Sequence, residues 1–230
     1  MAVQRSLGNW AFGGILDFRS NPGHLHAVST RRFGSIGILV ARIGVYPGSF
    51  NPPTKAHLEI ALAAVSQHSL KRLDFALSLS PLGKAEVEVP SFAHRLEVVE
   101  QSLLEHESLA VVVTEEQLIS DIADGYDVVV MGADKWHQVN DPAWYNDDTQ
   151  ARDSAVDRLP TVALAPRPPH VIPAALQLPV SDDLIEISST AARAGHTDQM
   201  TLAAAQFDAE TGAWTNPAKY QLWHAPEERD

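Results

Sequence analysis

The stretch that decides the fold is Gly44-Val45-Tyr46-Pro47-Gly48-Ser49-Phe50-Asn51-Pro52-Pro53-Thr54-Lys55-Ala56-His57-Leu58. The mostly apolar run 38–45 leads into it and predicts a buried strand, and beyond His57 the apolar side chains recur at helical spacing. A turn dense in Gly and Pro separates the two. This order of strand, glycine turn and helix start is typical of phosphate sites, because glycine lets the backbone approach the ligand and the helix offers free N–H groups.

Thr54 and His57 place a hydroxyl and an imidazole together at the predicted helix start. A glycine-rich turn alone would equally fit an ordinary tight turn, and His57 alone would fit a helix-capping histidine. A second polar stretch, Ile187-Ser188-Ser189-Thr190-Ala191-Ala192-Arg193, predicts another helix start, with cap residues followed by an arginine one turn later. That pattern fits either a triphosphate site or an ordinary N-cap with a surface arginine.

Together these two stretches resemble the two signatures of the nucleotidyltransferase superfamily, whose usual forms are His/Thr-x-Gly-His and Ile-Ser-Ser-Thr-x-x-Arg. The intervening sequence alternates strands and helices. We expect strands at 73–79, 109–114, 126–131, 161–165 and 184–187, and helices at 91–107 and 115–123. The fold class is therefore predicted to be α/β, a Rossmann-like parallel sheet with helices on both faces, with ligands bound beyond the carboxyl ends of the strands.

The resemblance implies a reaction in which an acceptor phosphate oxygen attacks the α-phosphorus of ATP directly and pyrophosphate leaves. Such chemistry needs alignment of two anions and neutralisation of the growing charge rather than a protein nucleophile. By resemblance, His57 contacts the triphosphate and steadies the transition state, Thr54 donates to a phosphate, Arg193 grips the β- and γ-phosphates, and Mg²⁺ bridges phosphate oxygens. No side-chain ligand for the metal is assigned.

The remaining nucleotide contacts implied by the resemblance come from three segments. Gly132-Ala133-Asp134 follows the strand expected at 126–131 and resembles a nucleotide-contacting motif; Asp134 could face a ribose or a metal, or cap the next helix. The residues expected to bind the nucleotide are Gly48, Ser49, Phe50, Gly132, Asp134, Ser188, Ser189 and Thr190.

The acceptor site is less sharply defined. Trp136 and Trp144 follow the Gly-x-Asp motif, where the nicotinate-mononucleotide adenylyltransferases carry a tryptophan, so either could stack on a pyridine ring or simply pack a loop. Lys84, on the loop expected at 80–90, could bind the acceptor phosphate. Arg95 is expected to lie on a helix and to pair with a nearby acid.

Two departures from the family pattern leave the acceptor open. Ala56 replaces the usual glycine before His57, and Thr54 stands where the nicotinate enzymes commonly carry histidine. The leading hypothesis is transfer of AMP from ATP to nicotinate or nicotinamide mononucleotide, in NAD biosynthesis. Phosphopantetheine adenylyltransferase and a small cytidylyltransferase are alternatives of the same class, and a non-catalytic nucleotide-binding module is the alternative of another class.

Bulk composition bounds the partners and the compartment. The net charge of −12 argues against a general nucleic-acid binder, no apolar run reaches the roughly 20 residues of a membrane span, and the chain has no cysteine. We therefore expect a cytoplasmic protein whose partners are ATP and a small phosphorylated acceptor, with no nucleic acid and no membrane, and a homo-oligomer as an open option.

Charge and composition also set the N-terminal residues apart. Residues 1–42 contain five arginines and one acid, so the remainder is still more acidic than the whole. Residues 1–36 fit a disordered extension, a stretch absent from the mature protein, or an Arg-rich transit peptide. The nucleotidyltransferase domain, with a partly helical C-terminal segment, is expected at 37–230.

Overall fold

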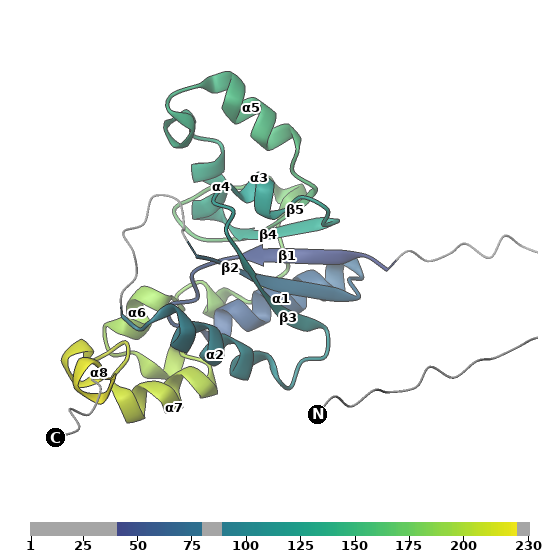
Figure 1. The fold of residues 1–230 in the computed structure, drawn as a ribbon. Helices are drawn as coiled ribbons and strands as arrows, with labels where there is room; N and C mark the ends of the chain where they lie inside the picture. The colour runs from purple at the N-terminus through teal and green to yellow at the C-terminus, as the bar shows by residue number, and fades with distance from the viewer. Residues whose placement is uncertain (1–40, 80–88, 225–230) are drawn as a thin grey trace, which may run out of the picture. The chain divides into compact units, whose positions relative to one another are not determined.

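The computed structural model describes residues 41–79 and 89–224, and within them five parallel strands form one sheet in the order β3-β2-β1-β4-β5 (Figure 1). The strands are β1 (Ile43–Pro47), β2 (Arg72–Ser78), β3 (Leu109–Thr114), β4 (Val128–Gly132) and β5 (Thr161–Ala165). From β1 the chain adds β2 and β3 on one side and then β4 and β5 on the other, so the topological switch point lies between β1 and β4. In such sheets ligands bind beside the switch point.

Alternation along the strands divides the core between the two faces of the sheet. Tyr46, Phe75 and Val130 pack in one buried cluster, while their chain neighbours Val45, Ala76 and Val129 pack in the other. Successive side chains of a strand point to opposite faces, so a strand covered on both faces must be apolar throughout. This explains the continuous apolar runs of the sequence and confirms the predicted Rossmann-like sheet.

Helices cover both faces of the sheet (Figure 1). One face packs against α1 (Lys55–His68) and α2 (Phe92–Leu103), and the other against α3 (Ile119–Ile122), α4 (Ala133–Val139) and α5 (Thr149–Asp157). None of the described helices is long and apolar enough to cross a membrane.

Most expected elements are present, with two notable differences. The strands at 109–114 and 161–165 match the expected bounds, and Ser91 caps α2 as predicted, accepting the N–H of His94 at 3.3 Å. The prediction of a strand at 184–187 is wrong. A 3₁₀ helix, η3 (Asp182–Leu184), ends there, and the N–H groups of Leu184 and Ile185 donate to the carbonyls three residues earlier in the chain. The helix expected at 115–123 shortens to the single turn of α3.

The C-terminal helices form a third cluster against α2. They are α6 (Ser189–Arg193), α7 (Leu202–Thr211) and α8 (Pro217–His224), and Val98 of α2 is buried among residues such as Met200, Trp214 and Tyr220. The buried carboxylate of Asp208 holds the turn after α7, because it accepts the N–H of Trp214 at 2.7 Å and the N–H and hydroxyl of Thr215 at 3.0 and 2.6 Å.

We expect Asp208→Ala to lower the free energy of unfolding by about 3 kcal/mol, because two backbone N–H groups and a hydroxyl lose a charged acceptor. Asp208→Asn keeps an acceptor oxygen for the two N–H groups and should cost much less. Urea unfolding of both variants measures the difference, and equal stabilities would contradict this account of the turn.

Candidate active site

Two adjoining cavities open at the carboxyl ends of the central strands. The larger, of about 400 Å³, is walled by the first motif, by the ends of β4 and β5, and by the second motif. The smaller, of about 100 Å³, lies on the other side of Pro47, Gly48 and Ser49, and Lys135 lines both cavities. Their position agrees with the site expected from the strand order.

The turn after β1 requires glycine at position 48. A Cβ on Gly48 would lie 2.6 Å from the ring of Phe50, and the Gly48 N–H donates to the carbonyl of Ala76 on the neighbouring strand at 3.0 Å. Phe50 itself adopts a positive φ of 44° and is buried against Tyr46 and Phe75. Aromatic packing therefore fixes the backbone that forms one wall of the larger cavity.

His57 lies in the first turn of α1 with its ring folded back onto Thr54. Its Nδ1 accepts the backbone N–H of Thr54 at 3.0 Å and lies 2.8 Å from the Thr54 hydroxyl. A backbone N–H can only donate, so Nδ1 is the acceptor and the proton of the neutral ring sits on Nε2. His57 thus caps the helix through one nitrogen, and its other nitrogen carries a proton that it can donate.

Burial keeps the His57 ring neutral in the free protein. Removal from water, reinforced by the nearby Arg167 guanidinium, lowers the pKa of His57 from 6.5 to about 4. At neutral pH the ring is therefore a hydrogen-bond donor rather than a cation. Thr54 is itself buried and its hydroxyl contacts the ring, which gives Thr54 a part in orienting His57 besides the phosphate contact expected for it.

The second motif docks directly on the first. Ser188 caps α6 by accepting the N–H of Ala191 at 3.0 Å, and the Ser189 hydroxyl donates to the carbonyl of Pro52 at 2.8 Å. Arg193 donates to the carbonyl of Asn51 and, at 3.3 Å, to the hydroxyl of Thr190. The two stretches singled out in the sequence therefore form one continuous wall of the larger cavity.

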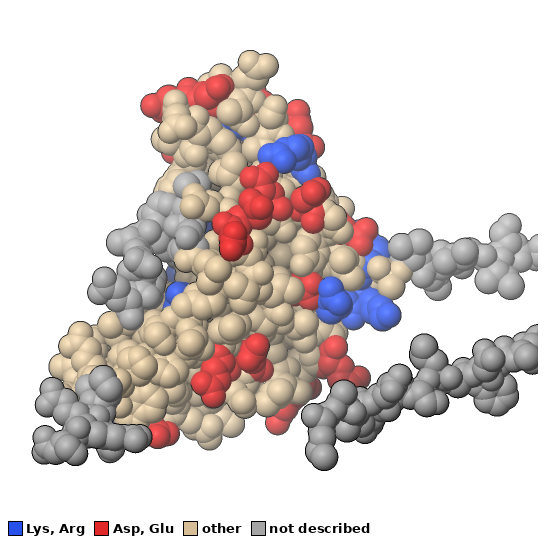
Figure 2. Space-filling view, in the orientation of Figure 1, with Lys and Arg blue, Asp and Glu red and all other residues tan. Residues whose placement is uncertain are grey.

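The larger cavity is basic in an acidic protein. Its described lining includes Lys135, Arg167 and Arg193 and a single carboxylate, Asp134, although the chain carries a net charge of −12 and Figure 2 shows acidic side chains spread over the visible face. A cavity with this excess of cations favours an anionic ligand, because charges that have left water interact strongly.

Asp134 lies in the first turn of α4, where it faces the larger cavity. Its carboxylate forms no hydrogen bond with another described residue, so the capping role considered for it is absent here. A Cβ at position 132 would lie 2.5 Å from the Asp134 carboxylate, so a larger residue there would displace this side chain.

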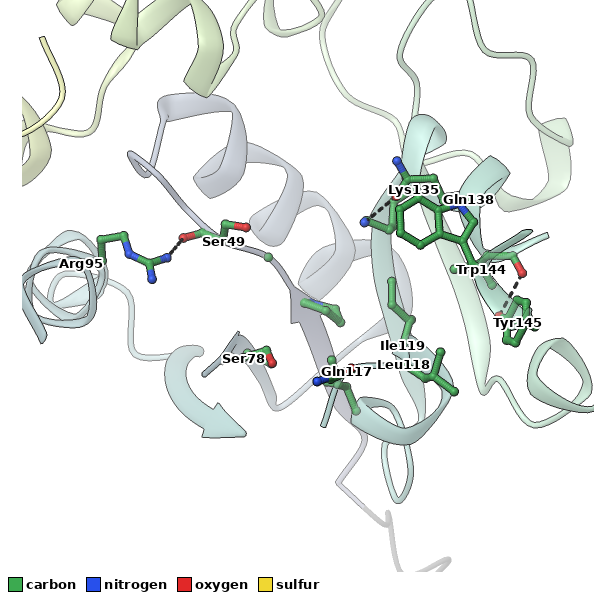
Figure 3. A pocket seen from close by; sticks show the side chains of 15 residues that line it. Ser49, Ser78, Arg95, Gln117, Leu118, Ile119, Lys135, Gln138, Trp144 and Tyr145 are labelled. Carbon is green, nitrogen blue, oxygen red and sulfur yellow. Dashed lines mark hydrogen bonds between the residues drawn. The ribbon is translucent and has the colours of Figure 1, made fainter. Parts of the chain in front are cut away.

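The smaller cavity is lined mainly by apolar side chains and by two cations, Lys135 and Arg95. Trp144 and Tyr145 of η1 (Pro142–Tyr145) lie on the same side as Lys135, while Arg95 lies opposite beside Ser49 (Figure 3). Its described lining contains no carboxylate. Trp136, which belongs to α4, lines neither cavity and packs against the core cluster on that face of the sheet. Lys84 lies outside the described residues.

Arg95 differs from what the sequence suggested. The expected acidic partner is wrong for the described part of the chain: Arg95 is only 5 % exposed, donates to the carbonyl of Ser49 at 3.2 Å and leaves Nε without a partner. Burial lowers the pKa of its guanidinium. An arginine that is buried without a counter-ion among the described residues, at the edge of a cavity, has capacity for an anionic ligand.

Of the three further cations of the site, sequence reasoning did not name Lys135 or Arg167, and it expected an acidic partner for Arg95. A signal existed for two of them, since Lys135 and Arg167 each come within three residues of the carboxyl end of a strand, β4 and β5. Arg95 sits on the cavity-facing side of a helix, and no local pattern distinguishes it from a surface arginine.

Comparison with known proteins places this geometry in a family. The cytidylyltransferase-like family model matches residues 45–195. Two structures of Plasmodium falciparum nicotinic acid mononucleotide adenylyltransferase share the fold: the complex with NaAD has a TM-score of 0.57 and 12 % sequence identity, and the complex with APC has 0.54 and 13 %. Each comparison covers 76 % of this chain and 97 % of the other.

No match was found among curated proteins. The family match nevertheless runs from β1 through the second motif, and so includes both cavities and well over half of the sequence. The chain belongs to the cytidylyltransferase-like family, within the nucleotidyltransferase superfamily whose two signatures it carries.

Proposed function

We propose that this protein transfers AMP from ATP to the phosphate of a pyridine mononucleotide, nicotinate or nicotinamide mononucleotide, and releases pyrophosphate. The observation that carries the proposal is the pairing of two cavities across the Gly48 turn. One is large and basic and contains His57 and Arg193; the other is small, has an aromatic wall and contains no described carboxylate.

The larger cavity supplies what adenylyl transfer requires. An acceptor phosphate oxygen forms a bond to the α-phosphorus as the α–β anhydride bond breaks, and negative charge grows on the departing pyrophosphate. The Nε2–H of His57 and the cations Arg167 and Arg193 are placed to stabilise that charge. Fixed donors in a partly dehydrated site are effective because they need no reorganisation during the reaction.

The cavity also fits Mg²⁺ in the manner usual for nucleotide enzymes. Mg²⁺ is commonly held by substrate phosphates, waters and one or two carboxylates rather than by an all-protein cage. Asp134 offers such a carboxylate, and no cluster of three potential metal ligands exists among the described residues. When bound with ATP, the ion would supply charge neutralisation on the triphosphate.

The smaller cavity supports a flat, anionic acceptor. The Trp144 ring forms part of its wall, and Arg95 and Lys135 provide positive charge on opposite sides of it (Figure 3). The fold relative with bound NaAD is a nicotinate-nucleotide enzyme, which supports the same choice.

The absence of cysteine fits the expected reducing, cytoplasmic setting.

Pyrophosphate release tests the proposal directly. Purified protein with Mg²⁺ is given ATP or CTP together with nicotinate mononucleotide, nicotinamide mononucleotide, 4′-phosphopantetheine or glycerol 3-phosphate. We expect release with ATP and a pyridine mononucleotide. Release with another pair would replace the proposed acceptor, and ATP binding without release from any pair would favour a non-catalytic nucleotide-binding module.

Substitutions at His57 distinguish the roles of its two ring nitrogens. His57→Asn keeps an acceptor for the Thr54 N–H but has no group at the Nε2 position, so turnover should fall about 100- to 1,000-fold while the fold survives. His57→Gln, which reaches the Nε2 position, should retain more activity. His68→Ala, at the far end of α1, is the matched control. Wild-type turnover in His57→Asn would show that Nε2 has no part in the reaction.

The protonation of His57 provides a second, independent test. NMR titration of the free protein should give His57 a pKa of about 4, and Mg²⁺–ATP should raise it because the triphosphate stabilises the imidazolium. Since the folded pKa lies below the unfolded value of 6.5, the stabilisation is fully present above pH 6.5 and is lost as pH falls towards about 4. A pKa near 6.5 in the free protein would contradict the described environment of His57, and a pKa that ATP does not raise would contradict contact between His57 and the triphosphate.

A further inference from the structure

The loop between the Gly48 turn and α1 is held in place by the C-terminal part of the chain. The Thr201 N–H donates to the carbonyl of Pro53 at 3.2 Å, and Thr54 forms an antiparallel bridge with Met200. Trp214 adds a side-chain contact, because its indole Nε1–H donates to Asn51 Oδ1 at 2.5 Å. These contacts come from residues beyond the 45–195 covered by the family model.

The bond from Trp214 fixes the orientation of the Asn51 amide. An indole N–H is a donor only, so the atom of Asn51 that faces it must be the carbonyl oxygen. The NH₂ group of Asn51 therefore lies on the other branch of the amide, and it donates to no described residue. Asn51 also lines the larger cavity, beside Arg193, which donates to the Asn51 backbone carbonyl.

Trp214 is well suited to hold this orientation. It is 4 % exposed, its backbone N–H is bound by the buried Asp208 carboxylate, and its ring contacts Phe207 edge-to-face at a centroid distance of 5.9 Å. A side chain fixed by packing and by hydrogen bonds beneath it can hold a contacting group in one geometry at little further entropic cost.

We propose that the side-chain NH₂ of Asn51 binds a phosphate oxygen of the nucleotide, and that Trp214 is the positioning residue that aims it. The inference rests on the proposed function, since it takes the larger cavity as the triphosphate site. The phosphates are the part of the nucleotide that Asn51 would meet, because its neighbours on this wall are Ser189, Thr190 and Arg193 of the second motif.

Asn51→Asp is the decisive variant. Aspartate can still accept the Trp214 N–H, so the loop keeps its anchor, but the donor is replaced by a negative charge facing a polyanion. Calorimetry should show the Kd for Mg²⁺–ATP rising more than tenfold, and more than in Asn51→Ala, with the unfolding temperature little changed. Wild-type affinity in Asn51→Asp would overturn the proposal.

Trp214→Phe tests the positioning role. The phenyl ring fills much of the same space but cannot donate, so the Kd and KM for ATP should rise about fivefold while the KM for the acceptor stays unchanged. In the Asn51→Ala background the same substitution should add nothing, because Trp214 would act only through Asn51. Trp223→Phe, a partly exposed tryptophan on α8, is the matched control.

The outcomes separate this inference from the proposed function. A wild-type protein that binds Mg²⁺–ATP but transfers nothing would refute the activity, while the Asn51 variants would still decide the binding role. An equal loss from Trp214→Phe with and without Asn51 would refute positioning. If Trp214→Phe does not fold, the comparison of Asn51→Asp with Asn51→Ala carries the test. No binding of Mg²⁺–ATP by the wild type would end both proposals.

Discussion

The docking of the second motif onto the carbonyls of the first is the constraint on which the site depends. Ser189 and Arg193 donate to the carbonyls of Pro52 and Asn51, two residues that are far from them in sequence. Neither motif would form a phosphate site alone, since one is a glycine turn and the other a single helical turn. Together, the two motifs line a cavity of about 400 Å³, and both His57 and Arg193 belong to its lining. The proposed specificity for phosphates therefore depends on tertiary structure rather than on either local pattern.

The placement of charge follows the same logic. An acidic body would repel ATP unless the few available cations were concentrated where the nucleotide binds. Arg167 and Lys135 stand just beyond the ends of β5 and β4, so the sheet itself delivers them to the cavity. Burial, reinforced by the charge of Arg167, lowers the pKa of His57. A neutral imidazole with its proton on Nε2 is suited to donate a hydrogen bond to phosphate without needing to be protonated first.

Much of the fold could be predicted because most positions of the strands are apolar, Asp74 of β2 being a buried exception, and this pattern is local. The strands at 109–114 and 161–165 were predicted to the residue, and the parallel sheet followed from their alternation with helices. The strand expected at 184–187 failed because Asp182 and Asp183 favour a turn that uses the backbone N–H groups locally. The prediction that Arg95 pairs with a nearby acid failed for a different reason. The burial of Arg95 beside the carbonyl of Ser49 depends on the packing of α2 against the Gly48 turn, which no spacing within the helix reveals.

The C-terminal helices connect these observations. Helices α7 and α8 were expected only as a partly helical segment, yet the packing of this C-terminal region on α2 sets the backbone of 51–54 through Thr201, Met200 and Trp214. The same backbone carries Thr54, whose N–H fixes the tautomer of His57 and whose hydroxyl lies 2.8 Å from His57 Nδ1. A continuous series of contacts therefore runs from Asp208 through Trp214 and the 51–54 loop to the imidazole that faces the nucleotide cavity. Residues outside both signature motifs thus hold the backbone whose N–H group bonds to the signature histidine.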